Sequence, residues 1–200
     1  MTKVYQINGI TPVVDPSAFV HPDAVLIGDC IIGPHCYIGP CACLRGDFGR
    51  IVIAEGASVQ DTCVIHTFPQ RDTIIEKKVH VGHGAVLHGC TIKSNALIGM
   101  NCVIMDGVIV GKNSFVAAMS FLKSEFKVPD NSLVAGVPGK IIRELTQEEI
   151  LWKSKGTSLY QQLVIQSLKT MKRVEPLVKV ENNRQRSKFF NQIKPLHEMD

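Results

Sequence analysis

Aliphatic residues recur at every sixth position over much of the chain. They stand at Val20, Leu26, Ile32, Ile38 and Leu44, at Ile53, Val59 and Ile65, and at Ile92, Ile98, Ile104, Val110 and Val116. Most are followed four positions later by a small residue, namely Ala24, Cys30, Cys36, Ala42, Ala57, Cys63, Ala96, Cys102, Val108 or Ser114. Two kinds of position that share a period of six define a hexapeptide repeat.

A six-residue unit of one short strand and one corner turns the chain through a triangle. Three units therefore make one coil of about eighteen residues in a parallel β-helix, with the aliphatic and small side chains stacked inside. Cys30, Cys36, Cys63 and Cys102 occupy the small inward position, so we interpret them as compact core residues rather than catalytic thiols. Cys41, Cys43 and Cys90 lie off this position, and the sequence gives them no role.

Both ends of the repeat are marked in the sequence. Residues 1–18 alternate and then break at prolines, which predicts a short capping strand. Thr146-Gln-Glu-Glu149 is a capping box that opens a helix. An imperfect apolar stripe extends that helix over residues 147–173, with a kink or break expected at Gly156. Its residues are Ile150, Leu151, Leu159, Leu163, Ile165, Leu168 and Met171.

We therefore predict an all-β fold with a C-terminal α-helix. Residues 1–145 form the β-helix domain with its N-terminal cap, and residues 146–200 form the helix and a tail. The helix is expected to pack along the β-helix or on a neighbouring subunit. The tail from Val180 is polar and charged, is expected to be partly disordered, and offers Phe189 and Phe190 as an anchor.

Composition narrows the class of protein. A chain of 200 residues with 45% hydrophobic content suffices for one domain and an appendage. No run of eighteen apolar residues and no leader pattern occurs, so we expect neither a membrane span nor export, and a cytoplasmic location. Seven cysteines in such a chain indicate a reducing compartment. The net charge of +4 falls largely in the C-terminal third without aromatic residues interleaved, which argues against nucleic-acid binding.

Three of the seven histidines, His66, His83 and His88, fall close together in the middle of the chain. A lone histidine in a β-rich core is usually just a hydrogen-bonded residue. Three of them among small and aliphatic residues favour a metal site that keeps a fourth position open for water. Two interruptions of the repeat, Gly46–Arg50 and Thr67–Lys78, flank these coils and are expected to leave the scaffold as loops.

Spacing separates one histidine from the other two. The interval from His66 to His88 is one coil plus loop residues, so these two can stack on one face. His83 precedes His88 by a stretch that spans about 16 Å of extended chain, too far for both to share the same ion within one subunit. We expect His83 to serve an ion held by the next subunit of a ring, most simply a homotrimer.

The periodicity resembles the left-handed β-helix of the hexapeptide-repeat superfamily, and Gly136–Lys140 resembles the segment that leaves its last coil. Arg45-Gly-Asp47, Gln60-Asp61, His66 and the pair His83 and His88 also resemble, in order, the motifs of the γ-class carbonic anhydrases. This resemblance implies zinc, or iron or cobalt, bound by the three histidines at a trimer interface. It also implies that Arg45 and Asp47 join subunits and that Gln60 hydrogen-bonds the metal-bound water. Asp61 is a candidate partner for Arg45 or for a ligand histidine.

Other stretches, among them Leu44–Ile51, Ile104–Gly107 and Val174–Leu177, resemble the bacterial phenylacetic-acid degradation proteins and, somewhat less, the carnitine-operon proteins. The first resemblance implies a thioesterase in which metal-bound hydroxide attacks a coenzyme A thioester. Tyr160 aligns with a tyrosine near the metal pocket of that family, although a packed helix residue fits equally well. The archetypal anhydrase shuttles protons with two acidic residues; here Phe48 stands at the place of the first, and the short stretch Thr67–Asp72 offers no glutamate to match the second.

Three functions follow from these patterns. The leading one is metal-dependent hydrolysis of a coenzyme A thioester from phenylacetate catabolism, with hydration of carbon dioxide to bicarbonate as its neighbour. The second is acyl transfer, against which three clustered histidines argue. The third is a non-catalytic trimeric scaffold in which the metal only holds the subunits together.

Overall fold

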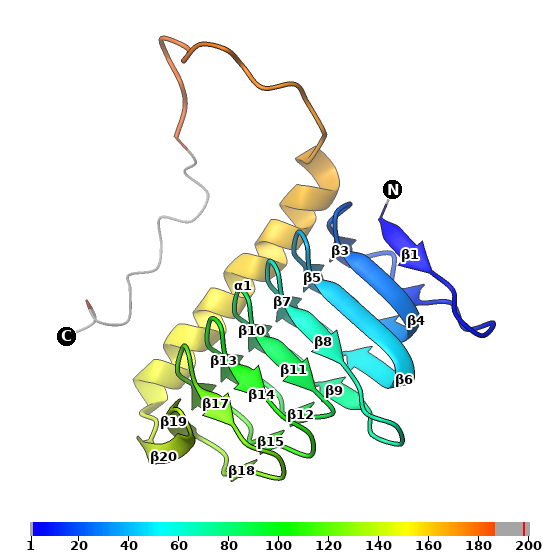
Figure 1. The fold of residues 1–200 in the computed structure, drawn as a ribbon. Coiled ribbons are helices and arrows are strands. Elements are labelled where there is room, and N and C mark those ends of the chain that lie inside the picture. The colour runs from blue at the N-terminus through cyan, green and yellow to red at the C-terminus, as the bar shows by residue number, and fades with distance from the viewer. Residues whose placement is uncertain (1, 187–197, 199–200) are drawn as a thin grey trace.

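The computed structural model describes residues 2–186 and residue 198. The predicted anchor, Phe189 and Phe190, lies outside these residues. As predicted, the body of the molecule is a left-handed parallel β-helix with one helix along its side (Figure 1). The pairing of successive coils defines three faces, here called face 1, face 2 and face 3. They meet at the 1/2, 2/3 and 3/1 edges.

Every face is a stack of short parallel strands. Face 1 contains β1 (Lys3–Tyr5), the first halves of β4 (Val25–Ile32) and β6 (Cys43–Ile53), β8 (Val64–His66), β11 (Val86–His88), β14 (Val103–Ile104) and β17 (Phe121–Leu122). Face 2 contains β2 (Val13–Val14), the second halves of β4 and β6, β9 (Thr73–Ile75), β12 (Thr91–Ile92), β15 (Ile109–Val110) and β18 (Lys127–Val128).

Face 3 contains β3 (Phe19–Val20), β5 (Tyr37–Ile38), β7 (Ser58–Val59), β10 (His80–Val81), β13 (Leu97–Ile98), β16 (Phe115–Val116), β19 (Ser132–Gly136) and β20 (Gly139–Glu144). The last strand, β20, runs antiparallel to β19 and ends the stack. The turn between them lies inside the predicted exit segment, Gly136–Lys140. At the other end, β1 pairs with β4, which confirms the predicted capping strand.

Coil length is regular except around the histidines. Leu97 pairs with Phe115 across a coil of regular length, whereas the coils from Tyr37 to Ser58 and from Ser58 to His80 are both longer. The next coil, from His80 to Leu97, is one residue shorter than the regular coil. This deletion shifts the repeat by one position and places Cys90 inside the core, 1% exposed, where the sequence predicted no role for it.

The two interruptions differ from the prediction. The first interruption, Gly46–Arg50, forms a bulge within β6 rather than a separate loop: Gly46 still pairs with Gly28 and Ile51 with Cys30, and the residues between them have no Cα partner in β4. The second interruption leaves it only as far as Asp72, since Thr73 begins β9. Within this shorter loop Arg71 reaches down the edge to Glu125 at 2.5 Å.

The aliphatic and small side chains of the repeat fill the interior as predicted. The largest fully buried side chains are Leu26, Ile32, Ile38, Leu44, Ile51, Ile53, Ile65, Ile75, Leu87, Ile92, Ile98 and Ile104. The predicted inward cysteines are buried, and burial raises the pKa of Cys30, Cys36 and Cys63 to about 11. A thiol with so high a pKa is a poor nucleophile, which supports the core interpretation.

Helix α1 (Gln147–Thr170) begins with the predicted capping box. The Thr146 hydroxyl accepts from the Glu149 backbone N–H at 3.2 Å, and the Glu149 carboxylate accepts from the Thr146 N–H at 2.8 Å. The expected break at Gly156 is wrong, since α1 continues through it. One glycine destabilises a helix by only about 1 kcal/mol, and the packing of this 24-residue helix against the β-helix stabilises it by more than that.

The predicted apolar stripe of α1 is also wrong over most of its length. Leu151, Ile165, Leu168 and Met171 are about half exposed or more. The buried side chains are instead Ile150, Lys153, Thr157, Val164 and Ser167. They repeat every three or four residues, so they line one side of the helix. Short or polar side chains fit there because face 3 supplies the bulk, with Phe19, Tyr37 and Phe115 pointing at the helix.

Lys153 is the unexpected member of this buried side, at 3% exposure. Its ammonium donates to the Lys78 carbonyl and, at 3.0 Å, to Asn95 Oδ1 at the 2/3 edge. Burial, and secondarily the charge of Lys78, lowers the pKa of Lys153 from 10.5 to about 7.

This shift makes stability depend on pH. Between pH 7 and pH 10.5 the unfolded chain binds a proton that folded Lys153 has released, so the free energy of unfolding rises with pH, by up to about 1.4 kcal/mol per pH unit. Lys153→Met should flatten the dependence measured by denaturant unfolding between pH 7 and pH 9. Lys155→Met, at an exposed position of α1, is the control and should leave the slope unchanged. Equal slopes in wild type and Lys153→Met would contradict this assignment.

Candidate functional site

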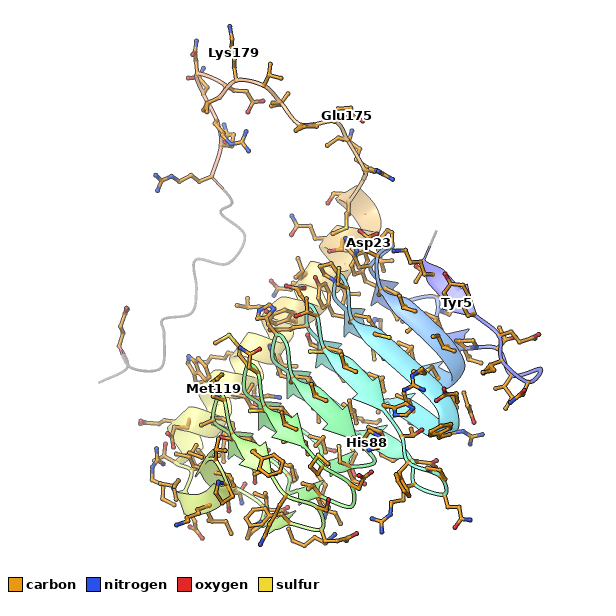
Figure 2. All side chains as sticks on the ribbon, in the orientation of Figure 1. Tyr5, Asp23, His88, Met119, Glu175 and Lys179 are labelled. Carbon is orange, nitrogen blue, oxygen red and sulfur yellow. The ribbon has the colours of Figure 1, made fainter. Side chains whose placement is uncertain are left out.

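The residues predicted for the site lie at both edges of face 1. The strands of face 1 run from the 3/1 edge to the 1/2 edge; Figure 2 shows Met119 near the start of this path and His88 at its far end. Gln60, Asp61 and His83 follow face 3 strands at the 3/1 edge. The 1/2 edge carries Arg45 and Asp47 within β6, where this strand passes from face 1 to face 2, and His66 and His88 at the ends of β8 and β11.

The structure brings His66 and His88 together. The two residues are Cα partners in the β8–β11 ladder, and their ring centroids lie 5.0 Å apart. Nδ1 of His66 faces Nε2 of His88 at 3.0 Å. The stacking predicted from their separation in the sequence is therefore confirmed.

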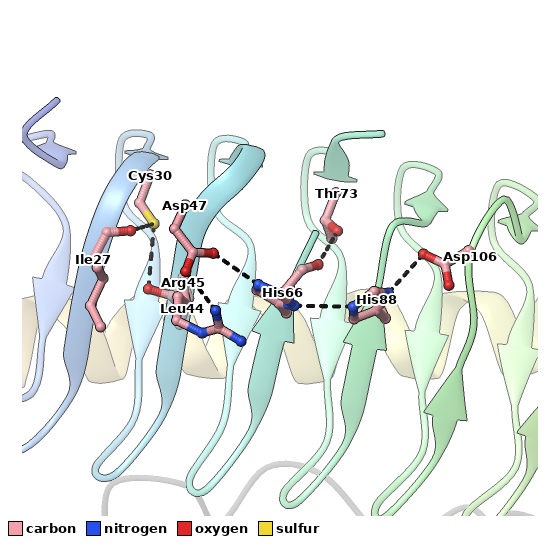
Figure 3. A network of polar contacts seen from close by, with 9 residues as sticks. All are labelled: Ile27, Cys30, Leu44, Arg45, Asp47, His66, Thr73, His88 and Asp106. Atoms are coloured by element: carbon pink, nitrogen blue, oxygen red, sulfur yellow. Dashed lines mark hydrogen bonds and ion pairs between the residues drawn. The ribbon is translucent and has the colours of Figure 1, made fainter. Parts of the chain in front are cut away.

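Each ring is held from outside by a carboxylate (Figure 3). Nε2 of His66 lies 2.9 Å from Asp47 Oδ1, and Nδ1 of His88 lies 2.7 Å from Asp106 Oδ1. Carboxylates only accept hydrogen bonds, so these outer nitrogens carry the ring protons. A neutral imidazole has one N–H, which leaves lone pairs on the two nitrogens that face each other. Lone pairs at this separation repel unless a cation or an extra proton lies between them.

This donor set fits a metal ion. Carboxylates behind ligating imidazoles fix the tautomer and strengthen the ligand, an arrangement common to zinc sites. Both side chains of the pair are largely buried, with 12% of His66 and 28% of His88 exposed. His66 and His88 would supply two ligands, and further ligands must come from elsewhere. Among the residues that the structure describes, no three His, Cys, Asp or Glu side chains of one chain converge on a metal position.

Asp47 also binds Arg45, whose guanidinium donates to Oδ2 at 2.5 Å within the same chain. Burial raises the pKa of Asp47, but hydrogen bonds from His66 and Arg45 outweigh it and hold the carboxyl below its ordinary pKa. The Asp47 carboxylate therefore stays charged and can keep its hydrogen bond to the imidazole. That Arg45 and Asp47 join subunits stays a prediction.

His83 does not join the pair within one chain, in line with the spacing argument. Its Nδ1 lies 3.0 Å from Asp61 Oδ2 at the 3/1 edge, and about half of each side chain is exposed. Within one chain Asp61 is thus the partner of a histidine, and its pairing with Arg45 stays a prediction. Nearby, the Gln60 side chain is buried, 4% exposed, and its carboxamide contacts His80.

Tyr160 lies away from the histidine pair of its own chain. It packs with Phe19, Tyr37 and Val164 between α1 and face 3, and burial raises its pKa. Within one subunit Tyr160 is therefore a packed helix residue, which was the alternative interpretation.

Sequence reasoning missed two polar residues, Asp106 and His80. Asp106 follows His88 by one regular coil, so coil spacing offered a signal for it. His80 lies under α1, and its role depends on a helix whose buried side was predicted wrongly.

The family comparisons agree with the architecture. A model described as "Bacterial transferase hexapeptide (six repeats)" matches residues 11–46 and 89–124. The carnitine operon protein CaiE of Salmonella agona is 47% identical over 191 residues, which cover 96% of each chain. The chain belongs to the hexapeptide-repeat transferase family.

Two solved structures resemble the chain. A hexapeptide transferase family protein from Anaplasma phagocytophilum is 38% identical with a TM-score of 0.79, covering 82% of this chain and 97% of its own. A putative acetyltransferase from Bacillus cereus is 35% identical with a TM-score of 0.82, covering 84% and 98%. The carnitine-operon resemblance is thereby confirmed, whereas those to phenylacetic-acid degradation proteins and γ-class anhydrases stay expectations. In the described part of the chain, no helix is long and apolar enough to cross a membrane.

The carboxylates behind the histidine pair predict a measurable effect on metal affinity. Asp106→Asn keeps the size of the side chain but removes the charge that strengthens His88, so zinc affinity should fall about 10- to 100-fold. Competition with a chromophoric chelator on the full-length protein measures this. Asp29→Asn is the control, because Asp29 pairs with Arg50 and contacts no imidazole. An equal loss in both variants, or none in Asp106→Asn, would refute the arrangement.

Proposed function

We propose that this member of the hexapeptide-repeat transferase family cleaves acyl thioesters of coenzyme A, with water as the acyl acceptor at a metal ion. The observation that carries the proposal is the pair of facing nitrogens on His66 and His88, each ring held by its own carboxylate. A zinc ion bound there would lower the pKa of water to about 7 and polarise the thioester carbonyl.

The chain's own residues have distinct roles in this proposal. Asp47 and Asp106 hold the two imidazoles in the tautomer that presents lone pairs inward. Gln60, with a carboxamide that both donates and accepts, orients the attacking water without competing for its proton. A thiolate leaves readily without protonation, so hydrolysis of a thioester needs no acid beside the leaving group.

The surroundings of His66 favour this reaction over hydration of carbon dioxide. Phe48 places its ring 5.3 Å from that of His66, where a carboxylate would be needed to export protons. In the following loop, the carboxylate of Asp72 accepts from the Arg50 backbone N–H at 2.9 Å. Each reaction releases one proton per turnover at neutral pH, but only hydration at the rate of a fast anhydrase, about 10⁶ s⁻¹, depends on a relay. Neither residue supplies such a relay, and buffer can accept the proton at the slower turnover typical of enzymes.

A site shared between subunits of a homotrimer completes the ligand set. His83 and Gln60 lie at the 3/1 edge, and the histidine pair lies at the 1/2 edge of the same face. The strands between these edges carry an outward apolar row, formed by Val25, Cys43, Val64, Val86, Val103 and Phe121. Val64 is 43% exposed in the single chain, and a second copy packed on this row would bury it. Such packing would bring the 3/1 edge of one subunit to the 1/2 edge of the next.

Acyl transfer is the second candidate. The name of the family model and the similarity to a putative acetyltransferase favour it. The thioester substrate is the same in both reactions. Only the acceptor differs, because transfer requires an amine or hydroxyl of a second substrate.

Release of free coenzyme A tests the proposal and separates the two candidates. Thiol release is followed with phenylacetyl and carnitine-derived acyl thioesters, the second chosen because the relatives are named for a carnitine operon. Hydrolysis predicts release without any acceptor, loss on chelation and recovery with zinc. His66→Ala should lower turnover roughly 10²-fold or more, whereas His21→Ala at the 3/1 edge should not. Release that requires an added amine or alcohol would establish transfer, and release that survives complete metal removal would exclude metal-dependent hydrolysis.

Mixed oligomers test whether the site is shared. His66→Ala and His83→Ala should each be inactive alone. Where an intact His66 of one subunit meets an intact His83 of the next, co-expression in equal amounts should restore about a quarter of the wild-type sites. Turnover of co-purified mixtures, with mass determined by light scattering, measures this. A mixture no more active than either variant would place all ligands in one subunit.

A further inference from the structure

His80 is a partly buried polar residue to which neither the sequence nor the proposed mechanism assigns a role. It lies on β10 of face 3 and points outward under α1, next to aromatic side chains. The ring of Tyr160 meets its imidazole edge-on, with centroids 4.6 Å apart at 90°. Tyr160 in turn lies 5.8 Å from Tyr37, which stacks on Phe19 at 5.5 Å. A ring nitrogen that the aromatic side chains shield from water needs a hydrogen-bond partner within the protein.

That partner is Gln60. The Nε2 atoms of His80 and Gln60 are in direct contact. Burial, with smaller contributions from the charges of Lys153 and His83, lowers the pKa of His80 to about 3, so its imidazole is neutral at neutral pH. A neutral imidazole can accept at Nε2 when its proton is on Nδ1, and the Gln60 amide then donates to it. One N–H of the carboxamide is thereby fixed, and the amide plane with it.

This contact links the helix to the predicted site. The residue after Gln60 is Asp61, whose carboxylate pairs with His83 at 3.0 Å. Tyr160 on α1 closes the other side of the His80 ring. The sequence of contacts from α1 through Tyr160, His80 and Gln60 therefore ends beside the residue expected to complete the metal site.

We propose that His80 is a positioning residue that fixes the Gln60 carboxamide, so that α1, through Tyr160 and His80, sets the orientation of the water-binding amide at the 3/1 edge. The inference rests on the proposed function for the role of Gln60, although the contact itself belongs to the structure. A positioning role requires the ring nitrogen of His80, whereas a packing role would require only an aromatic ring at this place.

The variants separate these two roles. H80F keeps an aromatic ring against Tyr160 and removes the nitrogen that Gln60 contacts. H80Q restores a polar group that can accept from the amide. F115L changes another face 3 side chain under α1, one that packs with Leu145 and Ile150 and has no contact with Gln60, and it serves as the control for helix docking.

We expect H80F to lower kcat for thioester hydrolysis roughly tenfold or more with KM nearly unchanged, because a misplaced group loses the reacting geometry and not the binding. H80Q should recover part of the loss, and F115L should change the melting temperature more than kcat. Zinc content should stay at the wild-type level in all three. Equal kcat in H80F and wild type would overturn the proposal, as would equal losses in H80F and F115L.

A second measurement is independent of activity. In full-length protein with ¹⁵N-labelled glutamine and histidine side chains, His80 should give the shifts of a neutral Nδ1–H tautomer from pH 5 to pH 9. The Gln60 amide should move toward a free amide in H80F. A titrating His80, or a Gln60 resonance unaffected by H80F, would refute the positioning role even if H80F folds poorly. If wild type hydrolyses no thioester, the proposed function fails, and these resonances alone decide the role of His80.

Discussion

The parallel register between successive coils is the constraint on which the rest of this molecule depends. Each residue lies beside the residue one coil later, and the inward aliphatic rows leave no freedom to slip without exposing the core. Arg45, His66 and His88 are aligned by this register on three consecutive strands. Residues that are far apart in sequence thus become neighbours with fixed spacing, and the polar network at the 1/2 edge is a consequence of the packing of the interior.

The coils of unusual length all contribute to the site. The two longer coils, which end at Ser58 and His80, take up their extra residues at the 1/2 edge, beside the histidine pair, while the inward rows continue without interruption. The shortened coil that follows restores the repeat and brings Cys90 into the core. A β-helix tolerates such changes at its corners because only the strands carry the stacking, so chemistry can vary there at little cost in stability.

Much of this architecture could be predicted from the sequence because the repeat is locally encoded. The period of six gave the inward rows, and the spacing of the two histidines correctly stacked His66 on His88. The predictions failed where the outcome depends on contacts that are distant in the sequence. The buried side of α1 was predicted from apolarity, yet face 3 supplies aromatic side chains and accepts Lys153 and Thr157 opposite them. Cys90 was misplaced because one deleted residue cannot be located without the pairing, and His80 because its environment exists only once the helix is docked.

The polar groups at the two edges of face 1 complement each other chemically. At the 1/2 edge, two rings held by carboxylates face each other with lone pairs, which is stable only around positive charge. At the 3/1 edge, His83 pairs with a carboxylate but remains half exposed, and Gln60 is held from behind by a neutral imidazole. In the proposed site, a ring of copies would bring the His83 imidazole and the Gln60 amide of one subunit to the histidine pair of the next. One subunit cannot form this arrangement alone, because the two edges lie at opposite ends of the face 1 strands.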